Sequence, residues 1–171
     1  MAWTAPRTWA VNEIVTAAIM NGHVRDNLQY LRDIIDAIIS GTKAEIATQE
    51  TTTNTGWVNL DTVGPTATFS TGPLGMALVY VAATCSNSTD EGKARFSYVL
   101  RNASTDADVI SPSATLGGQL KGQDQERREG IMWFPTELVA NTDYKVIARY
   151  QSSDGANTAR FRDRTVWAFG L

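Results

Sequence analysis

The sequence predicts a mainly β protein: an antiparallel, jelly-roll-like sandwich preceded by an N-terminal extended leader and a trimerising α-helix. Short β-rich runs separated by clusters of Gly, Thr, Ser, Asn and Asp fill residues 42–171, which is typical of a sandwich. Residues 16–41 instead repeat apolar side chains at heptad spacing. Residues 1–15 show neither this helical period nor the alternation of a strand. We therefore expect an anchoring leader, a helical oligomerisation stalk and a β-sandwich head.

The leader combines two tryptophans with a proline and an arginine. Each indole offers a large apolar area, and leaving two of them in water is costly. We therefore expect the leader to dock, either on this protein's own surface or on a partner, and an unattached tail is the alternative. The expected anchoring residues are Trp3, Pro6, Arg7 and Trp9.

The stalk should begin at Thr16, a residue type that caps helix N-termini well, and end near Gly41, which can adopt a left-handed cap conformation. Between them, apolar side chains follow spacings of three and four residues, as in a coiled coil. Isoleucine at both core positions favours three or four strands, and a single polar core residue can fix the register. The expected seam is Asn21, Val24, Leu28, Leu31, Ile35 and Ile38.

The seam is about three heptads long, and with isoleucine at both core positions it leads us to expect self-association as a homotrimer. The alternative is an amphipathic helix packed on its own head, because an isolated helix of this length is marginal in water. Gly22 weakens the helix by about 1 kcal/mol relative to alanine, so we expect a kink there between leader and coiled coil. The next residue, His23, should be an interface histidine at or beside the seam.

In the head, the β-rich runs predict antiparallel strands that each have one apolar face. Phe96, Tyr98 and Leu100 alternate with Arg, Ser and Val, which indicates a half-buried strand. The run 76–86 is apolar on both faces and should be fully buried. The expected strands are 44–52, 56–60, 66–71, 76–86, 93–102, 112–120, 127–134, 143–151 and 158–169.

The last strand places Arg160, Arg162 and Arg164 at a period of two, with Asp163 between them. Alternate residues of a strand share a face, so we expect all three arginines on one face and Asp163 on the other. In a symmetric oligomer, these arginines would form an ion-pair layer between subunits. A plain exposed face is the alternative.

Composition and charge argue against several classes of function. A net charge of −3 gives no case for nucleic-acid binding, and no apolar run of about 18 residues predicts a membrane span. The N-terminus lacks the apolar segment of a secretory signal. With one histidine and one cysteine, the chain suits neither a histidine-based metal site nor a catalytic triad. We expect no enzyme activity and no cofactor, with Cys85 as a small buried hydrophobe.

Two blocks of sequence carry a family resemblance. The more specific block comprises the segments 3–9, 13–18 and 24–28, together with Asn21. The second block lies in the head and comprises 50–53, 64–68, 77–79, 86–88, 144–146, 158–161 and Arg164. Over nearly the whole chain, these blocks resemble small virion proteins of tailed bacteriophages and prophages, of the minor tail or tail-fibre-like type. The end of the last strand, 165–169, departs from that pattern because it is less aliphatic.

The resemblance implies a non-enzymatic virion structural protein, homotrimeric and made in the host cytoplasm. At a tail tip or fibre, it would be an attachment module that binds other virion proteins and a host cell-surface glycan or protein. As a capsid decoration protein, the same trimer would be anchored to the shell by its leader. A fibre-borne glycan hydrolase and a monomeric lectin-like domain are further alternatives, which differ in activity and in oligomeric state.

Overall fold

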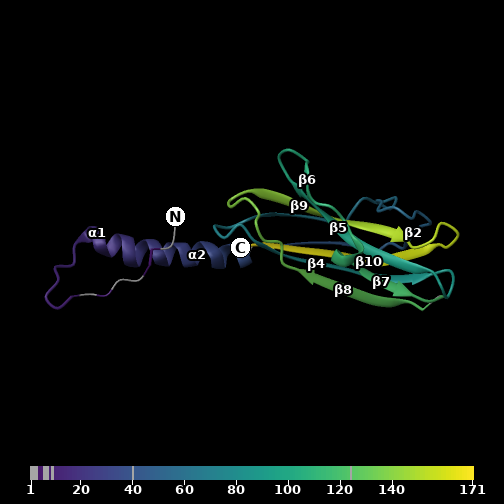
Figure 1. Ribbon diagram of the computed structural model, residues 1–171, viewed down its shortest axis with the longest axis horizontal. Coiled ribbons are helices and arrows are strands. Elements are labelled where there is room, and N and C mark those ends of the chain that lie inside the picture. Colours follow the sequence, from purple (N-terminus) through teal and green to yellow (C-terminus); the bar gives the residue numbers. More distant parts are fainter. Residues whose placement is uncertain (1–3, 6–7, 9, 40, 124) are drawn as a thin grey trace.

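The computed structural model describes residues 4, 5, 8, 10–39, 41–123 and 125–171, with the backbone alone at 37–39. The molecule is elongated, because a helical stalk projects from one end of a two-layered β head (Figure 1). The hydroxyl of Thr16 accepts a hydrogen bond from the amide of Ile19 at 3.3 Å and caps the helix as predicted. The stalk comprises α1 (Ala17–Met20), a π-helical turn (Asn21–Arg25) and α2 (Asp26–Ile39).

The strands of the head are β1 (Thr42–Ile46), β2 (Glu50–Thr52), β3 (Thr66–Ser70), β4 (Ala77–Asn87), β5 (Lys93–Asn102), β6 (Asp108–Ile110), β7 (Gly118–Lys121), β8 (Arg127–Trp133), β9 (Asp143–Ser152) and β10 (Ala159–Gly170). In sheet A they lie in the order β1–β10–β4–β8, and β2 also pairs with β10. In sheet B the order is β3–β9–β5–β6, and β7 also pairs with β5. Every one of these pairings is antiparallel.

This arrangement confirms the predicted fold, a mainly β, jelly-roll-like sandwich. The chain passes repeatedly from one sheet to the other: β2, β4, β8 and β10 lie in sheet A, whereas β3, β5 and β9 lie in sheet B. Each sheet is therefore assembled from strands that are distant in sequence. Sheet B is complete only once β9 has paired, and sheet A only once β10 has paired.

Three of the expected strands differ in the structure. The run 44–52 forms two strands, because β1 and β2 pair with different parts of β10. The run 56–60 contributes a single bridge, between Val58 and Tyr150. The run 112–120 divides into a 3-10 turn (Ala114–Leu116) and the short β7, and β6 has no counterpart in the prediction. Periodicity indicates which residues are extended, but a strand also needs a partner, which periodicity does not identify.

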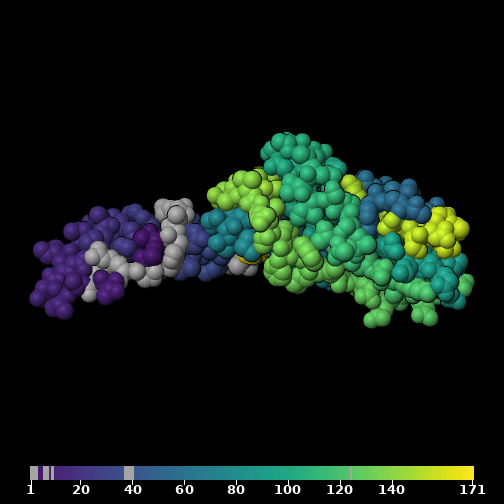
Figure 2. All heavy atoms as spheres, viewed as in Figure 1, coloured from purple at the N-terminus to yellow at the C-terminus, as the bar shows by residue number. Residues whose placement is uncertain are grey.

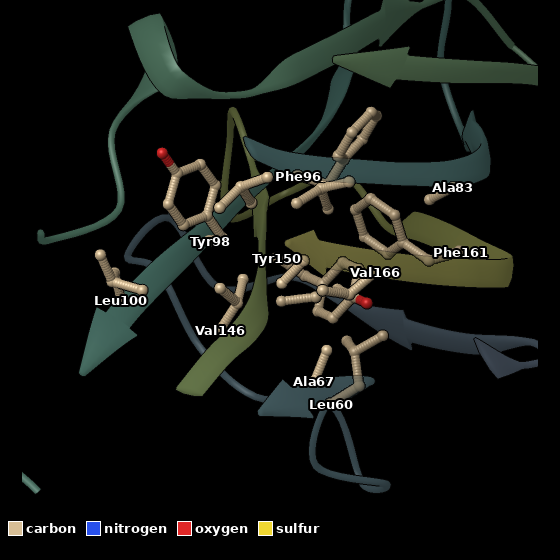
Figure 3. Close-up of a cluster of buried hydrophobic side chains, with 14 of the residues drawn as sticks. Leu60, Ala67, Ala83, Phe96, Tyr98, Leu100, Val146, Tyr150, Phe161 and Val166 are labelled. Carbon is tan, nitrogen blue, oxygen red and sulfur yellow. The ribbon is translucent and has the colours of Figure 1, made fainter. Parts of the chain in front are cut away.

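The core lies between the two sheets, as Figure 3 shows. Phe96, Tyr98 and Tyr150 of sheet B meet Val81 and Phe161 of sheet A, and all five side chains are buried. The rings of Tyr150 and Phe161 lie 4.9 Å apart across the sandwich. Burying an apolar side chain of this size stabilises the fold by about 1.5–3 kcal/mol, so this contact layer holds the sheets together.

Strand β4 matches its prediction only in part. Cys85 is buried, as expected, and burial with a smaller effect of Glu129 raises the pKa of its thiol to about 12. Leu78 and Tyr80, by contrast, are only half-buried on the outer face of sheet A. The expectation that both faces of this strand are covered is therefore wrong at its stalk end.

A β-bulge in β10 corrects the prediction for the three arginines. The register of β10 against β4 shifts between Arg162 and Thr165, where Asp163 has a left-handed φ of 47°. An extra residue in a strand reverses the face to which the following side chains point. Arg164 is therefore fully buried whereas Arg162 is exposed, so the three arginines do not share a face.

Inside the sandwich, Arg164 is held by residues from three other segments. Its guanidinium lies 3.1 Å from the carboxylate of Glu50 and donates to the carbonyl of Thr62 at 3.5 Å. It also lies 5.4 Å from the ring centroid of Tyr150. Although burial opposes ionisation, hydrogen bonds from Thr62 and the charge of Arg164 hold the pKa of Glu50 below its ordinary value.

Replacing Glu50 with alanine should destabilise the head strongly, because Arg164 would remain as an unpaired buried charge. We expect the free energy of unfolding in urea to fall by about 3–5 kcal/mol. Arg162→Ala removes an exposed arginine from the same strand and is the control, since it should cost far less. Equal losses for the two variants would contradict this role of the buried pair.

The same pair should make stability depend on pH. Because folding lowers the pKa of Glu50, its contribution is present above the unfolded value of about 4.5 and is lost as the pH falls through the lower folded value. Melting temperatures of the unsubstituted chain should therefore decline with acidification below that pH. In Glu50→Gln, the melting temperature should fall less over the same pH range, because glutamine does not titrate.

Candidate functional site

The stalk exposes an apolar stripe along the positions that the heptad pattern identifies. Leu28, Leu31 and Ile35 are 61%, 45% and 54% exposed, and Val24 in the π turn is 39% exposed. Figure 2 shows the narrow stalk standing apart from the broader head. The side chain of Ile38 lies outside the described residues. The described side chains of the stripe are thus about half exposed to solvent.

The π turn changes the phase of this stripe. Its hydrogen bonds close from i to i+5, so the turn holds one residue more than an α-helical turn. The amide of Asp26 accordingly donates to the carbonyl of Asn21. Asn21 is therefore rotated away from the line of Leu28 and Leu31 and does not continue their seam. Gly22, where we expected a kink, lies within this turn.

Asn27 fastens the leader to the stalk. Its buried side chain accepts a hydrogen bond from the amide of Thr4 and donates to the carbonyl of Thr4, each at 2.9 Å. A second bond from its amide nitrogen reaches the carbonyl of His23 at 3.3 Å. A turn in which the amide of Glu13 donates to the carbonyl of Ala10 reverses the chain before the helix. The predicted anchors Trp3, Pro6, Arg7 and Trp9 lie outside the described residues.

The outer face of sheet A carries an apolar hollow of about 460 Å³ that sequence reasoning missed. The ring of Trp167 lies 6.2 Å from that of Tyr80 and 6.3 Å from that of Phe169, in edge-to-face geometry. The sequence signal for this face is the spacing of two residues between Trp167 and Phe169, and between Leu78 and Tyr80, which places both members of each pair on one side of their strand. The apolar lining comprises Leu78, Tyr80, Met132, Trp167 and Phe169.

Polar side chains beside the hollow are bonded to one another. Nζ of Lys43 lies 2.7 Å from Oε1 of Glu45 and 5.5 Å from the ring centroid of Trp167. The hydroxyl of Thr165 accepts from Arg128 at 2.9 Å and donates to Glu45 at 3.3 Å. The hydrogen bond from Lys43 lowers the pKa of Glu45, so this carboxylate is ionised at neutral pH.

The outer face of sheet B is charged instead. Arg101 and Lys145 lie opposite each other on β5 and β9, and both pair with Asp106, at 3.4 Å and 2.6 Å. Arg101 also pairs with Asp108 at 2.6 Å. The hydrogen bond and charge of Lys145 hold the pKa of Asp106 below its ordinary value. These ion pairs contrast with the apolar hollow at the stalk end of sheet A.

The arginines of β10 are divided between the surface and the core. Arg160 and Arg162 precede the bulge, at the end of sheet A that is remote from the stalk, and Arg162 pairs with Glu126. Arg164 follows the bulge and pairs with Glu50 of the same chain. The structure therefore brings only two of the three predicted residues to one surface.

Metal-ligating and nucleophilic side chains were the remaining candidates for a chemical site. No set of three or more His, Cys, Asp or Glu side chains there could hold a metal ion. Cys85 is a poor nucleophile at neutral pH, because its buried thiol stays protonated. Within the described part of the chain, no helix has both the length and the hydropathy of a membrane-spanning segment.

No protein-family model and no curated protein matches the sequence. Eiger TNF from S. frugiperda is 10% identical with a TM-score of 0.39, over 77% of this chain and 92% of that one. The isomalto-dextranase of Arthrobacter globiformis T6 is 11% identical with a TM-score of 0.39, over 75% of this chain and 23% of that one. The CBM36-1 domain of a xylanase from the hindgut metagenome of Trinervitermes trinervoides is 9% identical with a TM-score of 0.35, over 75% and 96%. At such values the likeness concerns the sandwich fold alone.

Asn27→Ala should release the leader from the stalk, because both hydrogen bonds to Thr4 are lost. Each such bond contributes about 0.5–1.5 kcal/mol, so the amide of Thr4 should exchange with solvent roughly ten- to a hundred-fold faster. Gln29→Ala is the control, since Gln29 bonds to Asp33 on the same helix and leaves the leader untouched. Unchanged exchange at Thr4 in Asn27→Ala would show that the leader is held by other contacts.

Proposed function

We propose that this chain is a non-enzymatic, homotrimeric structural protein of a tailed-phage virion, which acts as an attachment module at the tail tip or fibre. The exposed apolar stripe of the stalk is the observation that carries this proposal. The family resemblance of the sequence supplies the virion setting. Other virion proteins, and a host cell-surface glycan or protein, are the proposed partners.

The stripe requires a partner on physical grounds. The stalk is helical from Ala17 to Ile39, and most of the stability of such a helix comes from packing of its apolar face rather than from helix propensity. The helix projects along the long axis, and its principal contact with the head is with β10 at its base. Parallel copies of the same helix would cover Leu28, Leu31 and Ile35 with one another. Isoleucine in the core positions favours three strands over two.

An attachment module needs one part that binds the particle and another that binds the host, and the stalk lies between the leader turn and the head. The turn that precedes the helix lies at the end remote from the head (Figure 1), and Thr4 of the leader is bonded to Asn27 in the stalk. A trimer built in this way would carry three leaders beside the stalk and three heads at the C-terminal end of the stalk. The leaders would contact the particle, and the heads would face the host.

A capsid decoration protein is the second candidate, and the shortness of the stalk favours it. At 1.5 Å per residue the whole stalk, from Ala17 to Ile39, is about 35 Å long, and only about 18 Å of it separates Asn27, which holds the leader, from the head. A cement protein needs only such a short spacer. Both candidates use the same trimer and differ in where it sits on the particle.

Charges placed in the stripe should dissociate the trimer. The full-length chain should sediment as a trimer at micromolar concentration, whereas the double variant Leu28→Glu/Leu31→Glu should sediment as a monomer, because six carboxylates would meet around the axis. Gln29→Glu, on the same helix but outside the seam, should remain trimeric. A monomeric unsubstituted chain would refute the homotrimer.

The position on the particle can be measured directly. Antibody labelling of intact virions should mark the tail, and quantitative mass spectrometry should find a few copies per particle. Labelling over the whole capsid, with many copies, would identify a decoration protein instead. Release of sugar from host polysaccharide by the purified chain would contradict the non-enzymatic role in either position.

A further inference from the structure

We infer that the heads of the trimer pack against one another through the half of the outer face of sheet A that lies nearest the stalk. This inference rests on the proposed homotrimer and adds the surface that joins its heads. We call this surface the proximal face. Its apolar side chains are Leu78, Tyr80, Met132, Trp167 and Phe169, and the polar side chains of Lys43, Glu45, Arg128 and Thr165 line its edge.

The proximal face begins where the stalk ends. A Cβ on Gly41 would lie only 1.9 Å from the ring of Phe169, so the backbone that leaves the helix rests directly on that ring. Phe169 pairs with Leu78 on the neighbouring strand. In the next row across the sheet, Trp167 pairs with Tyr80, and Tyr80 pairs with Met132. The apolar surface is therefore continuous from the base of the stalk across three strands.

The short connection between stalk and head brings neighbouring heads together. Two residues separate Ile39, the last of α2, from Thr42, the first of β1, and three peptide steps span roughly 10 Å at most. Helices in a bundle lie about 8–10 Å apart. Three heads tethered this closely to one bundle meet at their stalk ends, at a high effective concentration.

The polarity of sheet A changes along its strands as this packing requires. Further from the stalk, one row of the outer face consists of Arg162, Thr84 and Arg128. Arg162 pairs there with Glu126, so this part of the face is charged. On β10, β4 and β8 the large apolar side chains are thus concentrated near the stalk, and the charges beside them are those of Lys43 and Glu45 on the neighbouring β1, which pair with each other. Such an apolar concentration is expected if other heads cover that part of the three strands.

The aromatic rings of the proximal face are already ordered within one chain. Tyr80 lies across Gly130 of β8, where a Cβ would come within 2.4 Å of its hydroxyl oxygen. The indole of Trp167 is packed between the rings of Tyr80 and Phe169, and the ammonium group of Lys43 lies over the indole. A surface ordered in advance loses little conformational entropy when another molecule packs on it.

The chemistry of this surface favours a second copy over a sugar. A sugar ring can stack on an aromatic side chain, but its hydroxyls also need hydrogen-bond partners. The polar side chains beside the hollow bond to one another instead: Lys43 to Glu45, and Thr165 to both Glu45 and Arg128. Apolar side chains of a neighbouring head make no such demand, so another head is the better occupant.

Charged substitutions in the full-length chain test this interface. Met132→Glu and Leu78→Glu should each weaken trimer association at least about 100-fold in sedimentation equilibrium, because each places three carboxylates, one from every head, in an interface from which water is excluded. Val109→Glu on β6 is the matched control, since Val109 is 46% exposed and Met132 54%, but it lies in sheet B. Circular dichroism of each variant establishes that the head is folded. Trimer association unchanged in both proximal-face variants would overturn the inference.

Hydroxyl-radical oxidation of the unsubstituted chain provides a test that requires no substitution in the head. Met132 should be oxidised several-fold more slowly in the trimer than in the monomeric Leu28→Glu/Leu31→Glu variant. If the unsubstituted chain is itself a monomer, the homotrimer fails and this inference fails with it. If the chain is a trimer and Met132 reacts equally fast in both proteins, only this inference fails. If added maltohexaose slows the oxidation of Met132 and trimer formation does not, the proximal face binds a sugar instead.

Discussion

The bulge at Asp163 is the constraint on which both faces of sheet A depend. With an uninterrupted period of two, the register that buries Phe161 would also turn Trp167 and Phe169 into the core. The extra residue instead places Val166 in the core and both aromatic rings on the surface. A single residue of left-handed backbone thus creates the apolar hollow and, at the same time, buries an arginine.

The buried arginine links the bulge to the rest of the sandwich. Arg164 meets Glu50 on β2, the carbonyl of Thr62 and the ring of Tyr150 on β9, so one guanidinium connects both sheets and the loop between β2 and β3. Burying a charge is costly, and the pair offsets that cost only while every partner stays in place. The bulge is further held by the amide of Asp163, which donates to the carbonyl of Ala47 at 3.4 Å.

The two outer faces suit different surroundings. Sheet B presents ion pairs such as Lys145 with Asp106, which tolerate water, whereas sheet A presents aromatic rings at its stalk end. The helical stripe and the proximal face are both apolar, and they adjoin at the contact of Gly41 with Phe169. One axis of association would cover both surfaces and leave the charged faces outward.

The sequence by itself determined the periodicities of this protein: the stripe of Leu28, Leu31 and Ile35, and the alternation that predicts a sandwich. It did not determine which way side chains point once an inserted residue, in a π turn or a β-bulge, has interrupted the pattern. The π turn moves Asn21 off the seam, and the bulge moves Arg164 into the core. Only the tertiary structure decided these positions, because one inserted residue reorients every side chain that follows, and the partners that stabilise it lie far away in the chain.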